Sequence, residues 1–461
     1  MRFDPILADI RFGCGLSPGL APAQSPEALL DTLDGPDKAA QRFEIEPFPQ
    51  FQHRLFTFDT QAQARRDARG TDKEQAATDA QEATRQQSIS DQVRWFGQHL
   101  MRRTWSPQPF RERLAFFWAD HFTASGKTGV RRAGTSPYIE SAIRPHMSGL
   151  FEDLLIATVM HPLMVYYLDQ RRSVGPNSPH AAKGKTARGL NENLAREVME
   201  LHTLGVNGPY TQTDVRELAK LFTGVTLHPR TGIQFREDFA EPGAETVLGR
   251  TYGGGDTIRN DIEAALRDLA RHPATARHIA GKLAMHFVSD SPDADLVAAL
   301  EQRFVETRGD LRAVYGEMLR HPASMQTDQS NVKQPMDFIG STMRALAVPP
   351  NRFDDWTRRR MLEQLIRPLG LMGQTWELPD GPDGLDEDDA AWITPQGLAA
   401  RLQWAVTVPQ MLRPDLPDPR DFVETALGPR ATPTVQFAAS AAESRSDGVG
   451  IILASPAFQR M

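Results

Sequence analysis

The residues with the clearest potential for chemistry lie in one segment, 191–202 (NENLAREVMELH). It contains carboxylates, an arginine, a histidine and two amides: Glu192, Glu197, Glu200, Arg196, His202, Asn191 and Asn193. Carboxylates and imidazole can move protons or bind a divalent metal ion, and a guanidinium can hold an anionic group. We therefore treat the charged residues and His202 as candidate catalytic residues, and the two amides as candidate substrate ligands.

A helix over this segment would divide these groups between two faces. At about 100° per residue, the carboxylates and Arg196 share one polar face, whereas His202 lies roughly 160° from Glu200. His202 could then join a shared site only through another segment, or if the helix unwinds before Gly205, a glycine typical of a helix end. The polar face itself fits either a solvated surface with i, i+4 ion pairs or a buried network in which carboxylates need partners.

A second helix is predicted directly after a short turn. Thr211 and Asp214 have the spacing of a capping box at its start. Its apolar stripe is Val215, Leu218, Ala219 and Phe222. The two helices would form an αα-hairpin with the loop 205–210 at its tip.

His121 lies in a third helical pattern, residues 111–122 (RERLAFFWADHF). It falls on one stripe with Leu114, Phe117, Trp118 and Phe122. An apolar seam favours a hydrogen-bonded core histidine, but the alternative is a base or metal ligand in a dry site. We keep His121 as a candidate catalytic residue.

The fold predicted from the whole chain is all-α, a single large multi-helical domain over residues 1–461, with one short β-hairpin near 223–249. Ser-Pro pairs at 25, 106 and 136 resemble helix starts. His161, His272 and His321 each precede a proline, and we expect the latter two in the last turn of a helix, where a cation suits the dipole. Residues 61–90 almost lack large apolar side chains, which predicts a solvated helix or mobile segment. Residues 380–389 (DGPDGLDEDD) form an acidic loop without EF-hand spacing.

Bulk properties exclude some functions. The formal charge of −7 gives no basic surface for nucleic acid, and the single cysteine, Cys14, allows no internal disulfide. The sequence lacks a GxSxG nucleophile motif and an HExxH zinc motif. No signal peptide or membrane-spanning segment is apparent, so the expected location is cytoplasmic.

Over nearly its whole length, the chain resembles a large bacterial family, the domain-of-unknown-function family 1800. The most specific match is NENLAREVMELHTLGV with YTQTDVRELAKLFTG. Weaker matches in the expected order include IRFGCGLSPG, LAFFWADHF, KQPMDFIGSTMRAL and LGLMGQTWELPDGPDG. The resemblance implies one multi-helical unit and brings no established reaction.

The family pattern adds residues to the candidate site. Besides segment 191–202, it falls on Trp118, His121, Phe122, Asp169, Tyr210, Thr211, Asp214, Thr223 and Gly224. On this basis, Asp169, Tyr210 and Thr211 join the candidate substrate ligands. Gln170 and Val225 depart from the pattern, where relatives often have asparagine and an aromatic residue, and Val225 weakens the case for an aromatic lid.

Genes of this family typically lie beside a gene for a sulfatase- or alkaline-phosphatase-like protein that commonly carries a twin-arginine export signal. Three hypotheses remain open. The first is an enzyme acting on an anionic substrate by acid–base or metal-assisted chemistry, with Asp120 joining the candidate catalytic residues. The second is a non-catalytic partner of the sulfatase-like protein, co-exported with it to the periplasm. The third is a purely structural polar network. No cofactor is identified, although a divalent metal fits the first hypothesis.

Overall fold

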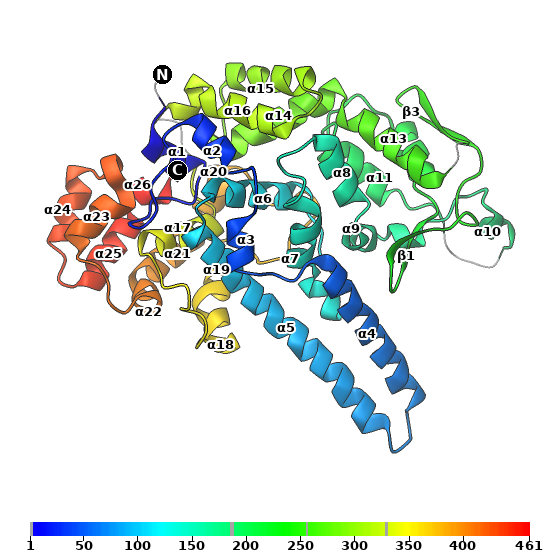
Figure 1. Cartoon of the computed structure of the whole chain (residues 1–461), viewed down its shortest axis with the longest axis horizontal. Helices are drawn as coiled ribbons and strands as arrows, with labels where there is room; N and C mark the ends of the chain where they lie inside the picture. The colour runs from blue at the N-terminus through cyan, green and yellow to red at the C-terminus, as the bar shows by residue number, and fades with distance from the viewer. Residues whose placement is uncertain (1–2, 185–188, 255–256, 328–330) are drawn as a thin grey trace.

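The computed structural model describes residues 3–184, 189–254, 257–327 and 331–461. Most of the described chain is helical (Figure 1). The first third contains α1 (Pro5–Arg11), α2 (Pro26–Asp31), α3 (Lys38–Arg42), α4 (Phe48–Asp67), α5 (Glu74–Trp105), α6 (Pro109–His121), the 3-10 helix η1 (Gly129–Gly134), α7 (Thr135–Tyr138), the π-helix η2 (Ile139–Ile143), α8 (Phe151–Val159) and α9 (Pro162–Tyr167).

The middle third contains η3 (Gln170–Arg172), α10 (Pro179–Ala182), α11 (Asn193–Glu197), the π-helix η4 (Val198–His202), α12 (Gln212–Leu221), β1 (Val225–His228), β2 (Gly232–Phe235), β3 (Ala244–Val247), β4 (Arg250–Gly253), α13 (Ile258–Ala270), α14 (Pro273–Phe287) and α15 (Ala294–Glu306). The last third contains α16 (Leu311–Arg320), η5 (Pro322–Met325), α17 (Pro335–Ala345), α18 (Arg358–Met361), η6 (Leu362–Ile366), α19 (Arg367–Leu371), α20 (Asp389–Trp392), α21 (Pro395–Thr407), α22 (Pro409–Leu412), α23 (Pro419–Leu427), η7 (Gly428–Arg430), α24 (Pro433–Ser440), α25 (Arg445–Ala454) and α26 (Pro456–Gln459).

The predicted all-α class and the β-hairpin are confirmed. Strands β1 and β2 pair antiparallel, with Val225 opposite Phe235. A second antiparallel pair, β3 and β4, extends the region to Gly253, slightly beyond the predicted range. None of the described helices combines the length and apolarity needed to cross a bilayer.

The buried apolar side chains form two large clusters that meet at α5 and α6. Adjacent residues of α5 contribute to different clusters, Trp95 to the first and Phe96 to the second. The first cluster extends through α8, α9 and α11–α16, and the second unites α17 with the C-terminal helices. These two central helices therefore fix the position of everything that projects from them, including Asp120 and His121 at the end of α6.

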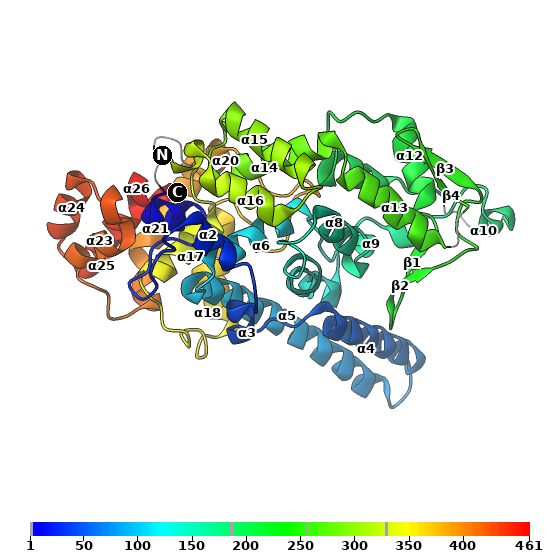
Figure 2. The ribbon, with the colours of Figure 1, turned by 45° about the horizontal axis from the view of Figure 1, so that its top comes forward.

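Helices α4 and α5 project from the body as a hairpin in both views (Figures 1 and 2). Its outer part is residues 61–90, where most side chains are exposed and α4 ends at Asp67 before α5 begins at Glu74. This outer part is therefore a pair of solvated helices, one of the two states that the sequence predicted for residues 61–90.

The proline-marked boundaries are only partly as predicted. Ser25 caps α2 by accepting the Ala28 N–H at 3.1 Å. Ser106 and Ser136 do not begin helices, because Ser106 is the C-cap of α5 and Ser136 lies inside α7.

The prediction that His272 and His321 both lie in the last turn of a helix is wrong for His272, which follows the C-cap of α13, whereas His321 lies directly after the last turn of α16 as its C-cap. His272 begins α14 and accepts the Ala274 N–H through Nδ1 at 3.1 Å, and His321 does the same for Ala323 at 3.3 Å. An accepting Nδ1 requires a neutral ring, so these histidines act as N-caps.

Candidate functional site

The 191–202 segment forms a short α-helix, α11, that widens into the π-helix η4. On its outer face Arg196 contacts Glu192 at 3.3 Å, Glu200 at 2.9 Å and Gln212 of α12 at 2.9 Å. The side chains of Glu192, Arg196 and Glu200 are 31%, 37% and 24% exposed. This face is thus a partly solvated ion-pair ladder, the kind that adds little stability by itself.

His202 lies on the opposite side, as the helical geometry predicted. Its side chain is fully buried and packs against Phe122, with ring centroids 5.1 Å apart. Neither of its ring nitrogens has a hydrogen-bond partner among the described residues. Burial, reinforced by the nearby Lys282 and His278, lowers the pKa of His202 to about 3, so the ring is neutral at physiological pH.

Two other histidines bind the end of this helix. His121 Nε2 lies 3.2 Å from the carbonyl oxygen of His202, and His278 Nε2 lies 3.0 Å from that of Leu201. A helix end leaves such carbonyls without partners, and a ring N–H can donate to each. Burial holds the pKa of His121 well below its ordinary value. The geometry therefore favours a structural role for His121, and a proton-transfer role for it or His202 stays a prediction.

Glu197 is the carboxyl of this helix whose protonation changes near neutral pH. Its pKa is raised to about 7 by partial burial and then by the negative charges of Glu200 and Asp383, against the opposing effect of Arg196. Tyr167, at the end of α9, belongs to the same neighbourhood, because both Glu197 and Asp383 raise the pKa of its hydroxyl. The arrangement supplies a group that can both accept and donate a proton at neutral pH.

Asp120, near the end of α6, contacts the acidic loop 380–389. Its Oδ1 accepts the Leu385 N–H at 2.9 Å. Burial and the Glu387 and Asp383 charges raise its pKa to about 8, although Lys282 opposes the shift. Loop 380–389 is therefore attached to the body, and its Glu387 also contacts Nδ1 of buried His286 at 3.0 Å.

The remaining sequence candidates serve the local backbone. The Asn191 side chain donates to the Leu168 carbonyl at 2.9 Å and accepts the N–H of Asn193. Asp169 has a left-handed backbone, φ 56°, and pairs with Lys127 at 2.7 Å.

At the loop tip, the Tyr210 hydroxyl donates to the Val206 carbonyl at 3.0 Å. Thr211 and Asp214 form the predicted capping box, and the apolar stripe of α12 is buried. The substrate-ligand roles of Asn191, Asn193, Asp169, Tyr210 and Thr211 stay predictions.

A cavity that sequence reasoning missed lies on another side of Asp120. Its volume is about 110 Å³, and α5, α6, the α7–η2 region and segment 374–385 surround it. Glu377 and His99 line it, and Ser136 connects the two: its hydroxyl donates to Glu377, and His99 Nε2 lies 3.1 Å from Ser136 Oγ. Serine, not histidine, occupies the middle of this chain of contacts, so it is not the arrangement of a catalytic triad. The residues are far apart in sequence and match no motif.

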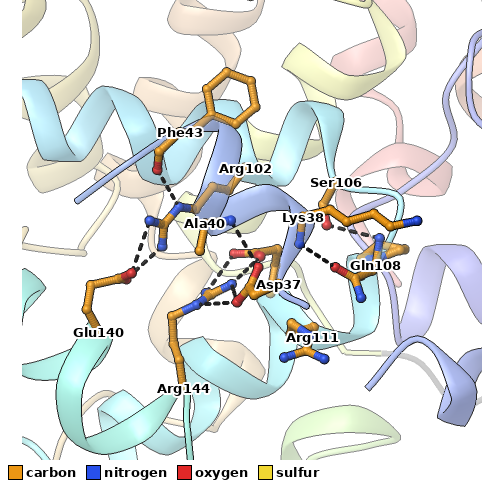
Figure 3. Close-up of polar contacts among 12 residues, drawn as sticks. Asp37, Lys38, Ala40, Phe43, Arg102, Ser106, Gln108, Arg111, Glu140 and Arg144 are labelled. Carbon is orange, nitrogen blue, oxygen red and sulfur yellow. Dashed lines mark hydrogen bonds and ion pairs between the residues drawn. The ribbon is translucent and has the colours of Figure 1, made fainter. Parts of the chain in front are cut away.

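A buried ion-pair network supports this cavity (Figure 3). Arg144, which lines the cavity, binds Asp37 at 2.5 Å and Glu112 at 2.7 Å. Arg102 of α5 binds Glu140 of η2 at 2.6 Å and also donates to the Phe43 carbonyl at 2.9 Å. These pairs connect α3, α5, α6 and η2, and so hold the walls of the cavity in place.

No group of three or more His, Cys, Asp or Glu side chains in the described ranges is arranged to hold a metal ion. His202 is fully buried, whereas Glu200 lies on the partly solvated outer face, as expected from helical geometry.

These features define a helical protein with carboxyl groups that titrate near neutrality around the end of α6 and α11. The family described as "Protein of unknown function (DUF1800)" matches residues 10–460. The chain belongs to this family. Searches of curated proteins and of solved structures gave no significant match.

Proposed function

We propose that the protein is an enzyme that uses general acid–base chemistry, with Glu197 as the group that transfers the proton. The observation that supports this is the half-buried Glu197 carboxyl, which burial, Glu200 and Asp383 bring to a pKa of about 7. A carboxyl with such a pKa is present in both protonation states at neutral pH, as proton transfer in both directions requires. Tyr167, whose hydroxyl lies within the electrostatic influence of Glu197, is a candidate for orienting a bound substrate.

The charge around Glu197 bears on the substrate. Arg196 already pairs with Glu192 and Glu200, and Asp383 adds a further negative charge. An anionic substrate held by Arg196 stays a prediction, to which these paired charges add no support.

Chemical labelling tests the state of Glu197. A carbodiimide activates protonated carboxyl groups, and the labelled peptide can be identified by mass spectrometry. At pH 7 we expect Glu197 to be labelled well above Glu192, which lies on the same helix and is ion-paired with Arg196. Equal labelling of the two would contradict the proposed state of Glu197.

Complementation tests the enzyme proposal itself. In a deletion strain of the native host, the Glu197→Gln variant should fail to restore the wild-type phenotype, whereas Glu192→Gln should restore it. Gln has nearly the same shape as Glu and removes a carboxylate that is costly to bury, so we expect the Glu197→Gln variant to fold. Full rescue by folded Glu197→Gln would overturn the proposal.

One surface favours the second hypothesis, a binding partner. The outer face of α21 exposes Leu398, Leu402 and Val406, at 39%, 40% and 42%, at successive i, i+4 positions. Neighbouring exposed positions of this helix carry no charge, and contiguous apolar surface often marks a protein contact. Co-purification of the sulfatase-like protein with wild-type chain, and its loss with Leu402→Glu, would support this candidate. Retention of the partner by Leu402→Glu would count against this surface.

A further inference from the structure

The cavity beside Asp120 has the composition of a small-molecule site. Its walls are mainly apolar and include Phe116, Ala119 and Leu378. A volume of about 110 Å³ suits a compact ligand of roughly six non-hydrogen atoms. Segment 374–385, which we call the strap, forms one wall and contributes Trp376, Glu377 and Leu385.

The arginines that line the cavity are already paired with carboxylates. Arg103 pairs with buried Asp337, which Arg113 also binds, and stacks on Phe116, with its guanidinium 4.8 Å from the ring centroid. Arg144 pairs with Asp37 and Glu112. An anionic ligand would have to compete with carboxylates that these arginines already bind at short range.

His99 adds no positive charge. It is buried, and its pKa is held well below the ordinary value by burial and by Arg102, Arg144 and Arg103. The lining groups that could supply an unpaired charge are therefore two carboxyls, Asp120 and Glu377.

Glu377 is held in a costly conformation. Its backbone is left-handed, with φ 53°, which a non-glycine residue rarely adopts. The Ser136 hydroxyl and the Gln92 amide both donate to its carboxyl, the latter at 2.9 Å. Burial raises its pKa to about 7. Strained residues of this kind concentrate at binding sites, because the surrounding structure must maintain them.

Asp120 faces an excess of negative charge. Glu387 and Asp383 of the acidic loop act on it, and Lys282 from α14 and the N–H of Leu385 oppose them. A positively charged group beside Asp120 would offset these negative charges.

We propose that this cavity binds a small primary amine as its ammonium ion, with the ammonium group beside Asp120 and the apolar body among Phe116, Ala119 and Leu378. The carboxylate supplies a charge-assisted hydrogen bond, and the aromatic rings of the wall add attraction for a cation. Glu197 is not among the residues that line the cavity.

Calorimetric titration with cyclopentylamine, which has six non-hydrogen atoms, tests the proposal. Cyclopentanol is the neutral control of matched shape, and cyclopentanecarboxylate is the anionic control. We expect saturable binding of the amine only. Its affinity should rise from pH 6 to pH 8 by up to roughly 50-fold, because the Asp120 pKa of about 8 leaves only a small ionised fraction at pH 6.

Two variants test the charge and the volume of the cavity separately. Asp120→Asn removes the charge and should reduce amine affinity at least tenfold at pH 8. Ala119→Leu fills the cavity without changing any charge and should also abolish binding. Glu363→Gln, whose carboxylate pairs with exposed Arg359 and does not line the cavity, should bind as the wild type does.

Equal affinity for cyclopentanol and the amine would overturn the assignment to a cation. Unchanged binding by folded Ala119→Leu, or no saturable binding of the amine by the wild type, would overturn the site.

Discussion

Asp120 should make the folded protein less stable as pH rises, and replacing it with asparagine should remove this effect. Burial and the charges of Glu387 and Asp383 raise the Asp120 pKa from 3.8 to about 8. The folded state thus retains a proton that the unfolded chain releases at much lower pH. Stability attributable to this group is therefore greatest below about pH 4 and is lost progressively between about pH 4 and pH 8.

The size of the effect follows from the two pKa values. The difference is about 4 units, and each unit corresponds to about 1.4 kcal/mol, which sets an upper bound of about 6 kcal/mol above pH 8. Local opening of the loop around Leu385 would admit water to the carboxylate and reduce this cost. We therefore expect about 2–4 kcal/mol of relative stabilisation by Asp120→Asn at pH 9, and little difference at pH 4.

The assay is urea denaturation of both proteins at pH 4 and pH 9, followed by tryptophan fluorescence. The amide oxygen of the Asp120→Asn variant can still accept the Leu385 N–H, so the substitution changes charge more than geometry. Asp169→Asn is the matched control, because its partner Lys127 is exposed and asparagine tolerates the left-handed backbone at this position. The same pH dependence in wild type and Asp120→Asn, or a lower midpoint for the variant at pH 9, would refute this account.

Three further predictions concern stability. Arg113→Ala breaks the buried pairing with Asp337 and should cost about 3–5 kcal/mol in urea denaturation; a loss below about 1 kcal/mol would show that Arg103 suffices alone. Thr211→Ala removes the capping box of α12 and should cost about 1 kcal/mol, measured by the same method, while an unchanged midpoint would show the cap to be dispensable. Gly384→Ala places a Cβ 2.7 Å from the Asp120 carboxyl at a φ of +82°, and should lower the thermal midpoint by several degrees; a midpoint equal to that of the wild type would mean that the loop adjusts freely.

The fold class and several details of the site could be predicted from local sequence patterns. The capping box at Thr211 and the helix end at Gly205, with φ +85°, depend on a few neighbouring residues and were predicted. The placement of His202 opposite Glu200 followed from helical geometry alone. The π-helical turn at 198–202 was not anticipated, because an extra residue in a turn leaves no mark on an apolar pattern of period 3.6.

Contacts between distant segments account for what sequence could not show. Asp120 is one more polar residue on α6 until Leu385, 265 positions away, is placed against it. Glu377 and Ser136 are 241 positions apart and gain significance only as neighbours. The His-Pro pairs were misinterpreted for a different reason: the same dipeptide fits the end of one helix and the start of the next, and only the direction of the Nδ1 hydrogen bond separates the two.

The projecting α4–α5 hairpin gives the chain a point where it can be cut without coming apart. Arg65, Arg66, Arg69 and Lys73 are concentrated at its tip, far from either apolar cluster, in a region of few large apolar contacts. Brief exposure to trypsin should therefore cleave there first. The two fragments would stay together, since the C-terminal half of α5 still contributes Trp95 and Phe96 to the apolar clusters. The cleaved protein would therefore run as two fragments on a denaturing gel and as one particle in solution.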